Sequence, residues 1–320
     1  MGYKPENING IENIDSAEIF EKGETKPFKA KIAWPNVLGF VLLHLACLYG
    51  LFLLPRAKLL TSFYTLFLMH FSGLSVTLGA HRLWSHRSYK ATLPLKLILL
   101  FGQTMSGQNC LWVWVRDHRQ HHKYSDTDAD PHNSSRGFFF CHIGWLMVQK
   151  HPEVLAKGRQ IDMTDLTADP YVMFQKRYYK TLYTLCAIII PVIIPWYFWN
   201  EDIINSLFIC YFARYTLQLN FTWCVNSVAH MFGNKPYDKR ISPVESTFVS
   251  IFGLGEGWHN YHHTFPWDCN AAEFGKDYNL SSRLLGLLER WGLAYDLKVV
   301  GRQMMINKIV KYGDGTHPVF

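Results

Sequence analysis

Four long apolar runs divide this chain of 320 residues, and polar segments separate them. The runs cover residues 37–54, 59–79, 179–199 and 203–228. A helix that spans a bilayer needs about 20 predominantly apolar residues. Only short polar breaks separate the first run from the second and the third from the fourth. The pattern therefore predicts an all-α membrane protein with four transmembrane helices in two hairpins.

The polar segments set the expected domain organisation. Residues 1–30 read as a polar N-terminal arm, residues 31–300 as one integral-membrane domain, and residues 301–320 as a C-terminal tail. Two shorter apolar segments, 93–109 and 246–255, cannot span a bilayer and are expected to be re-entrant or interfacial helices. Buried helices of a water-soluble bundle would be the alternative, but four runs of spanning length in two tight hairpins argue against it.

Charge predicts which side of the membrane the polar segments occupy. The chain has a net charge of +7, and the segment 80–178 is rich in arginine and lysine. Because cytoplasmic loops of membrane proteins carry an excess of these residues, we expect both termini, 80–178 and 229–320 to be cytosolic. Seven cysteines without a CxxC pair agree with a reducing compartment.

Histidines cluster in three short runs, all on the side predicted to be cytosolic. "RDHRQHH" contains His118, His121 and His122, and "GEGWHNYHH" repeats the spacing with His259, His262 and His263. "GAHRLWSHR" adds His81 and His86. Residues three and four apart share one helix face, and neutral imidazole is a common metal ligand. Eight ligands exceed the four of a zinc site, so the runs predict two metal ions of higher coordination number.

Other polar residues near these runs have a supporting role in this prediction. Metal-bound histidines usually donate their second ring nitrogen to a carboxylate. The available carboxylates are Asp117, Asp126, Asp128, Asp130 and Glu256. His132 is expected to be at most a neighbour of the ligands, and His44, His70, His142, His151 and His317 to be incidental.

The three histidine runs, with the sequence "HKYSDTDADPHNSSRGFFFCHIGWLM" after the second, resemble the histidine boxes of animal acyl-CoA desaturases, insect members especially. "NSVAH", from Asn226 to His230, resembles a further ligand segment of that family. The resemblance covers most of the chain. It implies an enzyme of the endoplasmic reticulum membrane with a helical cytosolic cap that holds a di-iron site. Such enzymes introduce a cis double bond into long-chain acyl-CoA with dioxygen and with electrons from cytochrome b5 and its reductase.

The resemblance also implies how the two irons are held. The family's first iron is bound by the residues that match His81, His86, His118, His122 and His259. Its second iron is bound by those that match His121, His230, His262 and His263, with Asn226 acting through a water. His230 enters as a ligand through the resemblance and not through spacing.

Substrate contacts follow from the same resemblance. The acyl-CoA contacts match Asn36, Asn109, Arg116, Asp117, Gln149, Lys150 and Trp223. Gln149 stands where the family often has arginine. An acyl chain has no polar group at its middle, so a tunnel of fixed depth must select the reacting carbon. Met69, Gly73 and Thr77, four residues apart on one helix face, are expected at its closed end.

Three other functions remain alternatives at this stage. A membrane di-iron hydroxylase of fatty-acyl or sterol substrates would share the histidine runs but form an alcohol. A desaturase could act at another carbon, such as delta-11, although "SPVE" at 242–245 resembles a motif frequent in delta-9 enzymes. A metal transporter or sensor would need more polar residues inside the apolar runs. Expected partners are acyl-CoA, cytochrome b5 and membrane lipid, with no nucleic acid.

Overall fold

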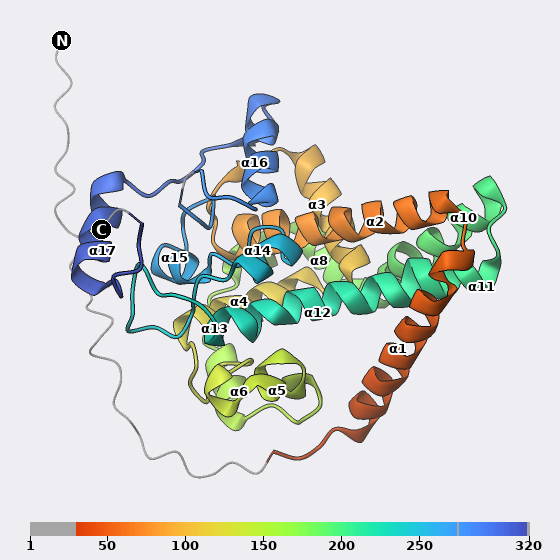
Figure 1. Ribbon diagram of the computed structural model, residues 1–320, viewed down its shortest axis with the longest axis horizontal. Helices are drawn as coiled ribbons and strands as arrows, with labels where there is room; N and C mark the ends of the chain where they lie inside the picture. The colour runs from red at the N-terminus through yellow and green to blue at the C-terminus, as the bar shows by residue number, and fades with distance from the viewer. Residues whose placement is uncertain (1–29, 274, 319–320) are drawn as a thin grey trace.

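The computed structural model describes residues 30–273 and 275–318, and almost all of its regular structure is helical (Figure 1). The polar arm predicted for residues 1–30 lies outside the described residues except for Ala30. The division into domains made from the sequence therefore stays a prediction.

The first two apolar runs form long helices that continue beyond their predicted ends. The first contains α1 (Trp34–Leu53) and η1 (Leu54–Arg56), and the second contains α2 (Leu59–Leu74) and the π-helix η2 (Ser75–Ser85). Large apolar side chains project outwards, with Leu42 65% and Phe67 63% exposed. Apolar surface of this extent is unfavourable in water and is expected against lipid.

The third and fourth apolar runs are also helical. The third comprises α9 (Tyr179–Tyr183), η5 (Thr184–Ile189) and α10 (Ile190–Trp199). The fourth comprises α11 (Ile203–Asn205), η6 (Ser206–Ala213) and α12 (Arg214–Asn226). Figure 1 shows α12 beside α2, and α1 packs against η6.

Three of the four predicted spans meet the length and composition of a membrane helix, within the part of the chain that the structure describes. They are Trp34–Arg56, Leu59–Ser85 and Tyr179–Trp199. The fourth run is helical but less apolar, because Arg214, Gln218 and Asn220 interrupt it. Arg214 is buried and donates from Nε to the Cys210 carbonyl oxygen at 2.8 Å.

The two hairpin turns are joined to each other at the end opposite the histidines. Glu201 is buried, and its carboxylate accepts hydrogen bonds from the Thr61 hydroxyl and, at 2.7 Å, from the Lys58 backbone N–H. Lys58 Nζ donates to the carbonyl oxygens of Trp199 and Asn200 at 2.7 and 2.8 Å. This network fixes the α1–α2 turn against the α10–α11 turn.

The remaining elements gather around those ends of the long helices that lie near the histidines, and we call them the cap. Between the hairpins lie β1 (Lys90–Ala91), α3 (Leu93–Ser106), α4 (Leu111–Lys123), η3 (Ser134–Arg136), α5 (Phe138–His142), η4 (Gly144–Leu146), α6 (Pro152–Gly158), α7 (Thr164–Ala168) and α8 (Pro170–Arg177). After the second hairpin come α13 (Val228–Met231), α14 (Thr247–Phe252), α15 (His259–Thr264), α16 (Leu280–Arg290), β2 (Ala294–Tyr295) and α17 (Arg302–Tyr312). Antiparallel pairing of β1 with β2 holds the end of the cap against its beginning.

One apolar core packs around η2 and α4, two of the elements that carry or precede the histidines. Leu78 and Leu83 of η2, Leu99 of α3, Val115 of α4 and Leu285 of α16 are buried together. The segments 93–109 and 246–255 contain the helices α3 and α14, so their predicted helical character is confirmed. Their position relative to a membrane stays a prediction.

We predict that Glu201→Ala destabilises the protein, because it leaves the buried Thr61 hydroxyl and the Lys58 N–H without their acceptor. Removing such an acceptor costs about 1–3 kcal/mol. The midpoint of thermal unfolding in detergent should therefore fall. Glu289→Ala, which removes an exposed carboxylate from α16, should leave the midpoint unchanged. Equal midpoints for the two variants would contradict the role given to Glu201.

Candidate metal centre

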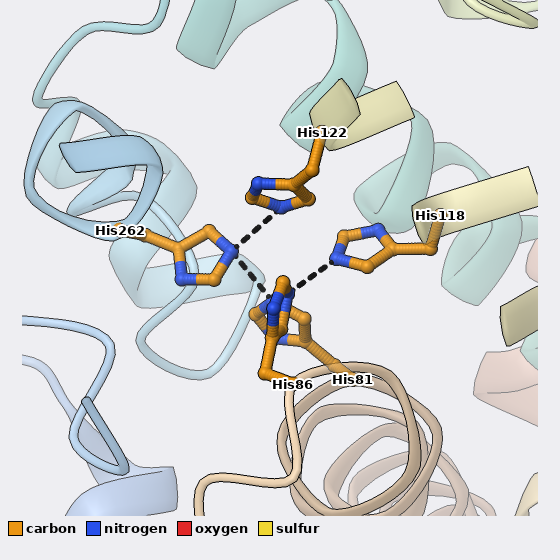
Figure 2. A group of neighbouring side chains, drawn as sticks. All are labelled: His81, His86, His118, His122 and His262. Carbon is orange, nitrogen blue, oxygen red and sulfur yellow. Dashed lines mark hydrogen bonds between the residues drawn. The ribbon is translucent and has the colours of Figure 1, made fainter. Parts of the chain in front are cut away.

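All nine histidines that were predicted to be metal ligands come together in two groups. Group 1 contains His81, His86, His118, His122 and His262, and group 2 contains His121, His230, His259 and His263. Within each group the ring nitrogens that could bind a metal all lie within 4.8 Å of one another. Figure 2 shows the five rings of group 1 converging from η2, from His86 just after it, and from α4 and α15.

The division between the groups corrects one expectation taken from the family resemblance. His262 belongs to group 1 and His259 to group 2, whereas the resemblance had suggested the opposite. Successive residues of an α-helix are about 100° apart, so positions i and i+4 differ by about 40° and positions i+3 and i+4 by about 100°. His118 and His122 therefore stay together, as do His259 and His263. The histidine at i+3 in each run turns towards the other group.

The first histidine pair depends on the π-helical geometry of η2. His81 and His86 are five residues apart, and in an α-helix such residues would point about 140° away from each other. Here the His86 N–H donates to the His81 carbonyl oxygen at 3.1 Å, the i to i+5 bond of a π-helix. Their ring centres are consequently only 4.9 Å apart.

Three carboxylates, two buried and one partly buried, orient three of the rings, and all three were among the sequence candidates. His81 Nδ1 lies 2.8 Å from Glu256, His121 Nδ1 lies 2.9 Å from Asp130, and His230 Nδ1 lies 3.3 Å from Asp126. The Nε2 atoms of His121 and His230 are buried without a hydrogen-bond partner. An imidazole that donates from Nδ1 has its lone pair on Nε2, so these two nitrogens are ready to bind a metal.

The electrostatics of the site favour neutral rings and charged carboxylates. Burial, reinforced by neighbouring imidazoles, lowers the pKa of His118, His122 and His262 well below the usual value. Burial alone would raise the pKa of the Asp130 and Glu256 carboxyls, but interactions with His121, His81 and Arg82 hold each pKa below its usual range.

The donor set fits two metal ions. Within the groups, facing Nε2 atoms lie 2.8 Å apart in His86 and His118, 2.9 Å in His81 and His262, and 3.1 Å in His259 and His263. Two nitrogens that each bind one metal at about 2.1 Å and at right angles lie about 3 Å apart. Five histidines in group 1 exceed a tetrahedral zinc site, and imidazole also suits iron and copper.

Two cavities meet at the histidines. Cavity A has a volume of about 390 Å³, and Met69, Gly73, Phe221, Phe252 and His81 contribute to its wall. Cavity B has a volume of about 360 Å³, and Asn109, Asp117, Trp145, Tyr215 and Trp223 contribute to its wall. The residues that line both cavities are Trp114, His118, Thr222 and Asn226. His118 of group 1 therefore faces the junction between the cavities.

The predicted substrate contacts gather around the entrance of cavity B. Asp117 accepts from Arg116 at 2.6 Å and from Lys150 at 2.8 Å, which brings two cations together beside the cavity. Asn109 and Trp223 line it. Asn36 donates to the carbonyl oxygen of Leu146, which also lines it. Gln149 is the residue before Lys150 and does not line cavity B.

Met69, Gly73 and Thr77, expected at the closed end of a tunnel, all line cavity A. Leu66, Ile251 and Phe252 contribute to the same wall, and the position of the three expected residues at a closed end stays a prediction.

Sequence reasoning missed the polar bridge at the cavity junction. Trp114 Nε1 donates to Gln108 Oε1 at 3.2 Å, and Gln108 Nε2 donates to the Thr222 hydroxyl at 3.0 Å. Trp114 also stacks on His118, with ring centres 5.0 Å apart. The spacing of four residues between Trp114 and His118 on α4 was a signal for this contact, but nothing in the sequence pointed to Gln108 or Thr222.

Apolar helices of spanning length and two histidine groups that could hold metal ions, placed at the junction of two cavities, are the architecture expected of a membrane metalloenzyme. Comparison with known proteins identifies its family. The fatty acid desaturase model matches residues 57–272, and the chain belongs to that family. It is 50% identical to stearoyl-CoA desaturase 5 of Bos taurus, over 97% of this chain and 92% of that protein.

Two cricket proteins show how far this similarity extends. The chain is 51% identical to an acyl-CoA Delta12-desaturase of Acheta domesticus, over 92% of this chain and 83% of that protein. It is 50% identical to an acyl-CoA Delta-9 desaturase of the same species, over 93% of this chain and 84% of that protein. Near-equal identity to enzymes named for different carbons means that overall similarity does not decide the position of the double bond.

We predict that Asp130→Ala weakens metal binding, because His121 loses the carboxylate that fixes its orientation. Changes to such supporting residues typically reduce metal affinity about 10–100-fold. Metal content after dialysis against a buffered iron(II) solution, measured by mass spectrometry, tests this. Asp128→Ala is the matched control, since Asp128 lies two residues away and contacts His151 at 3.9 Å. Undiminished metal content in Asp130→Ala would show that Asp130 does not support the site.

Proposed function

We propose that this desaturase introduces a cis double bond at carbon 9 of saturated long-chain acyl-CoA, with dioxygen and with electrons from cytochrome b5 and its reductase. The observation that carries the proposal is the position of His118, which faces the junction of the two cavities. A chain that enters through cavity B and continues into cavity A presents its middle, and not its end, to the histidines.

Recognition of the coenzyme A head is assigned to the charged residues at the entrance of cavity B. Arg116 and Lys150 supply positive charge for the phosphates, and Asp117 holds both cations in place. Arginine binds phosphate with two donors in a fixed geometry, while lysine acts as a point charge. Asn36, Asn109, Gln149 and Trp223 complete the proposed contact set. Anchoring of the head in this way fixes the distance along the chain to the junction.

Two iron ions are proposed for the histidine groups, with Asn226 acting through a water beside group 2. When bound, they supply the strong oxidant that removal of hydrogen from an unactivated methylene requires. The protein's own residues position and shield the reacting carbon. Glu256, Asp130 and Asp126 hold the rings in orientation, and Trp114 and Thr222 confine the chain at the junction.

The proposed location is the endoplasmic reticulum membrane, with both termini, the cap and the histidines on the cytosolic side. The positive-inside excess of basic residues in 80–178 supports this orientation. Electrons are then proposed to come from cytochrome b5 docking on the basic surface of the cap, where complementary charge would steer the encounter.

We predict that the full chain restores growth without added unsaturated fatty acids in yeast that lacks its own desaturase. Gas chromatography with mass spectrometry should find monoenes with the double bond at carbon 9. A hydroxylated product would identify a hydroxylase instead, and a double bond at carbon 11 or 12 would correct the position. His262→Ala should remain in the membrane but form no product, since group 1 loses a ring that approaches both His81 and His122.

We predict that Arg116→Ala raises the Michaelis constant for acyl-CoA, because a coenzyme A phosphate loses its charged partner. A hydrogen bond to a charged group contributes roughly 1.5–3 kcal/mol, which corresponds to a roughly 10- to 150-fold change. Initial rates in microsomes over a range of stearoyl-CoA concentrations measure the effect. Arg290→Ala, at the exposed end of α16, is the control. If the Michaelis constant of Arg116→Ala were as low as that of the control, Arg116 would not contribute to acyl-CoA binding.

A further inference from the structure

The two cavities open to surroundings of opposite character. Cavity B ends beside the polar, exposed side chain of Asn109 and the cations Arg116 and Lys150. Cavity A ends at Leu66 of α2 and at Ile251 and Phe252 of α14, which are 48%, 46% and 44% exposed. These apolar side chains belong to a spanning helix and to the short cap helix that lies against α12. Lipid is therefore the expected surroundings of this opening.

The other cavity offers no comparable exit for an acyl tail. Away from the cations, the wall of cavity B includes Gly107, Tyr183 and Tyr215. The Tyr215 hydroxyl donates to the Gly107 carbonyl oxygen at 3.2 Å, and the hydroxyls of Tyr183 and Tyr211 lie 2.8 Å apart. A Cβ on Gly107, whose φ is +68°, would approach Tyr215 to 2.6 Å. This wall is closely packed, so a long chain has to continue into cavity A.

Cavity A is longer than an eighteen-carbon chain needs. It follows α2 and η2 from His81 to Leu66, a stretch that rises on the order of 20 Å. An extended polypeptide backbone reaches roughly 3.6 Å per residue of three bonds, so an extended acyl chain advances roughly 1.2 Å per carbon–carbon bond. The nine carbons beyond a reaction at carbon 9 therefore reach roughly 11 Å. The remaining length accepts roughly seven further carbons before the tail emerges between α2 and α14.

We propose that the end of cavity A at Leu66, Ile251 and Phe252 is open to the bilayer and receives the tails of very-long-chain acyl groups. On this basis, the substrates extend beyond sixteen and eighteen carbons to chains of about 25 carbons. The inference rests on the proposed acyl-CoA desaturase function. The double bond stays at the same carbon counted from the thioester, because the head is held at cavity B whatever the length of the tail.

The test uses microsomes from desaturase-deficient yeast that express the full chain. They are supplied separately with palmitoyl-, stearoyl-, docosanoyl- and hexacosanoyl-CoA, and the products are analysed by mass spectrometry. Monoenes from all four substrates, with one position of the double bond, are expected. Products from the first two substrates alone would overturn this inference and leave the proposed function intact. No product from any substrate would overturn both.

A pair of variants tests the location of the exit. Leu66→Trp adds bulk to the opening and should lower the ratio of hexacosenoyl to hexadecenoyl product at least fivefold. Ile251→Trp, which narrows the same opening from α14, should act in the same direction. Phe67→Trp is the control, since Phe67 is exposed on α2 but does not line cavity A, and its product ratio should match that of the unmodified chain. Unchanged ratios in both rim variants would overturn the proposed exit.

Discussion

The packing of nine imidazole rings side by side, five of them buried and four partly buried, is the constraint on which the rest of the structure depends. Each ring loses water on burial, and nitrogens that face each other at about 3 Å repel unless a proton or cation lies between them. The surrounding protein is built to hold this arrangement. Carboxylates behind His81, His121 and His230 fix the rings, and a single apolar core fixes η2, α3, α4 and α16.

Much of this arrangement could be predicted from the sequence, because helical periodicity is visible in residue spacing. Both HxxHH runs do lie on helices, and the three carboxylates that contact the rings were among the five candidates. His259 and His262 lie in the opposite groups to those expected, since their grouping depends on how two helices are rotated relative to each other. The π-helix that brings His86 beside His81 also escaped prediction, because backbone hydrogen bonding in η2 depends on its packing. His230 lies on α13, a helix of four residues without a spacing signal.

The limits of the apolar runs were harder to predict than their existence. The second run extends to Ser85, so the spanning helix and the first histidine motif are one continuous element. Composition alone placed its end at residue 79 because His81 and Arg82 are polar. Both side chains are buried, and Arg82 contacts Glu256 at 3.2 Å. The fourth run shows the same effect, since the buried Arg214 and Gln218 lower its apolar character without preventing a helix. Buried polar residues lower the hydropathy of a helix, so the residue at which it ends cannot be predicted from composition alone.

One continuous helical element carries both a wall of cavity A and a histidine of group 1. His81 stands on the same helical element as Met69 and Gly73, so the wall of cavity A and a group 1 ring move as one body. Cavity B is fixed to the same centre through α4, which carries Asp117 at its entrance and His118 at the junction. Asp117 and His118 are adjacent on α4, so on the proposed function this one helix links the head-binding charges to the junction. Beyond the junction the wall of cavity A is mainly apolar, although the polar residues His70, Thr77 and Gln218 contribute to it. On the proposed function, the position of the double bond is determined from the head of the substrate, while the length of its tail stays free to vary.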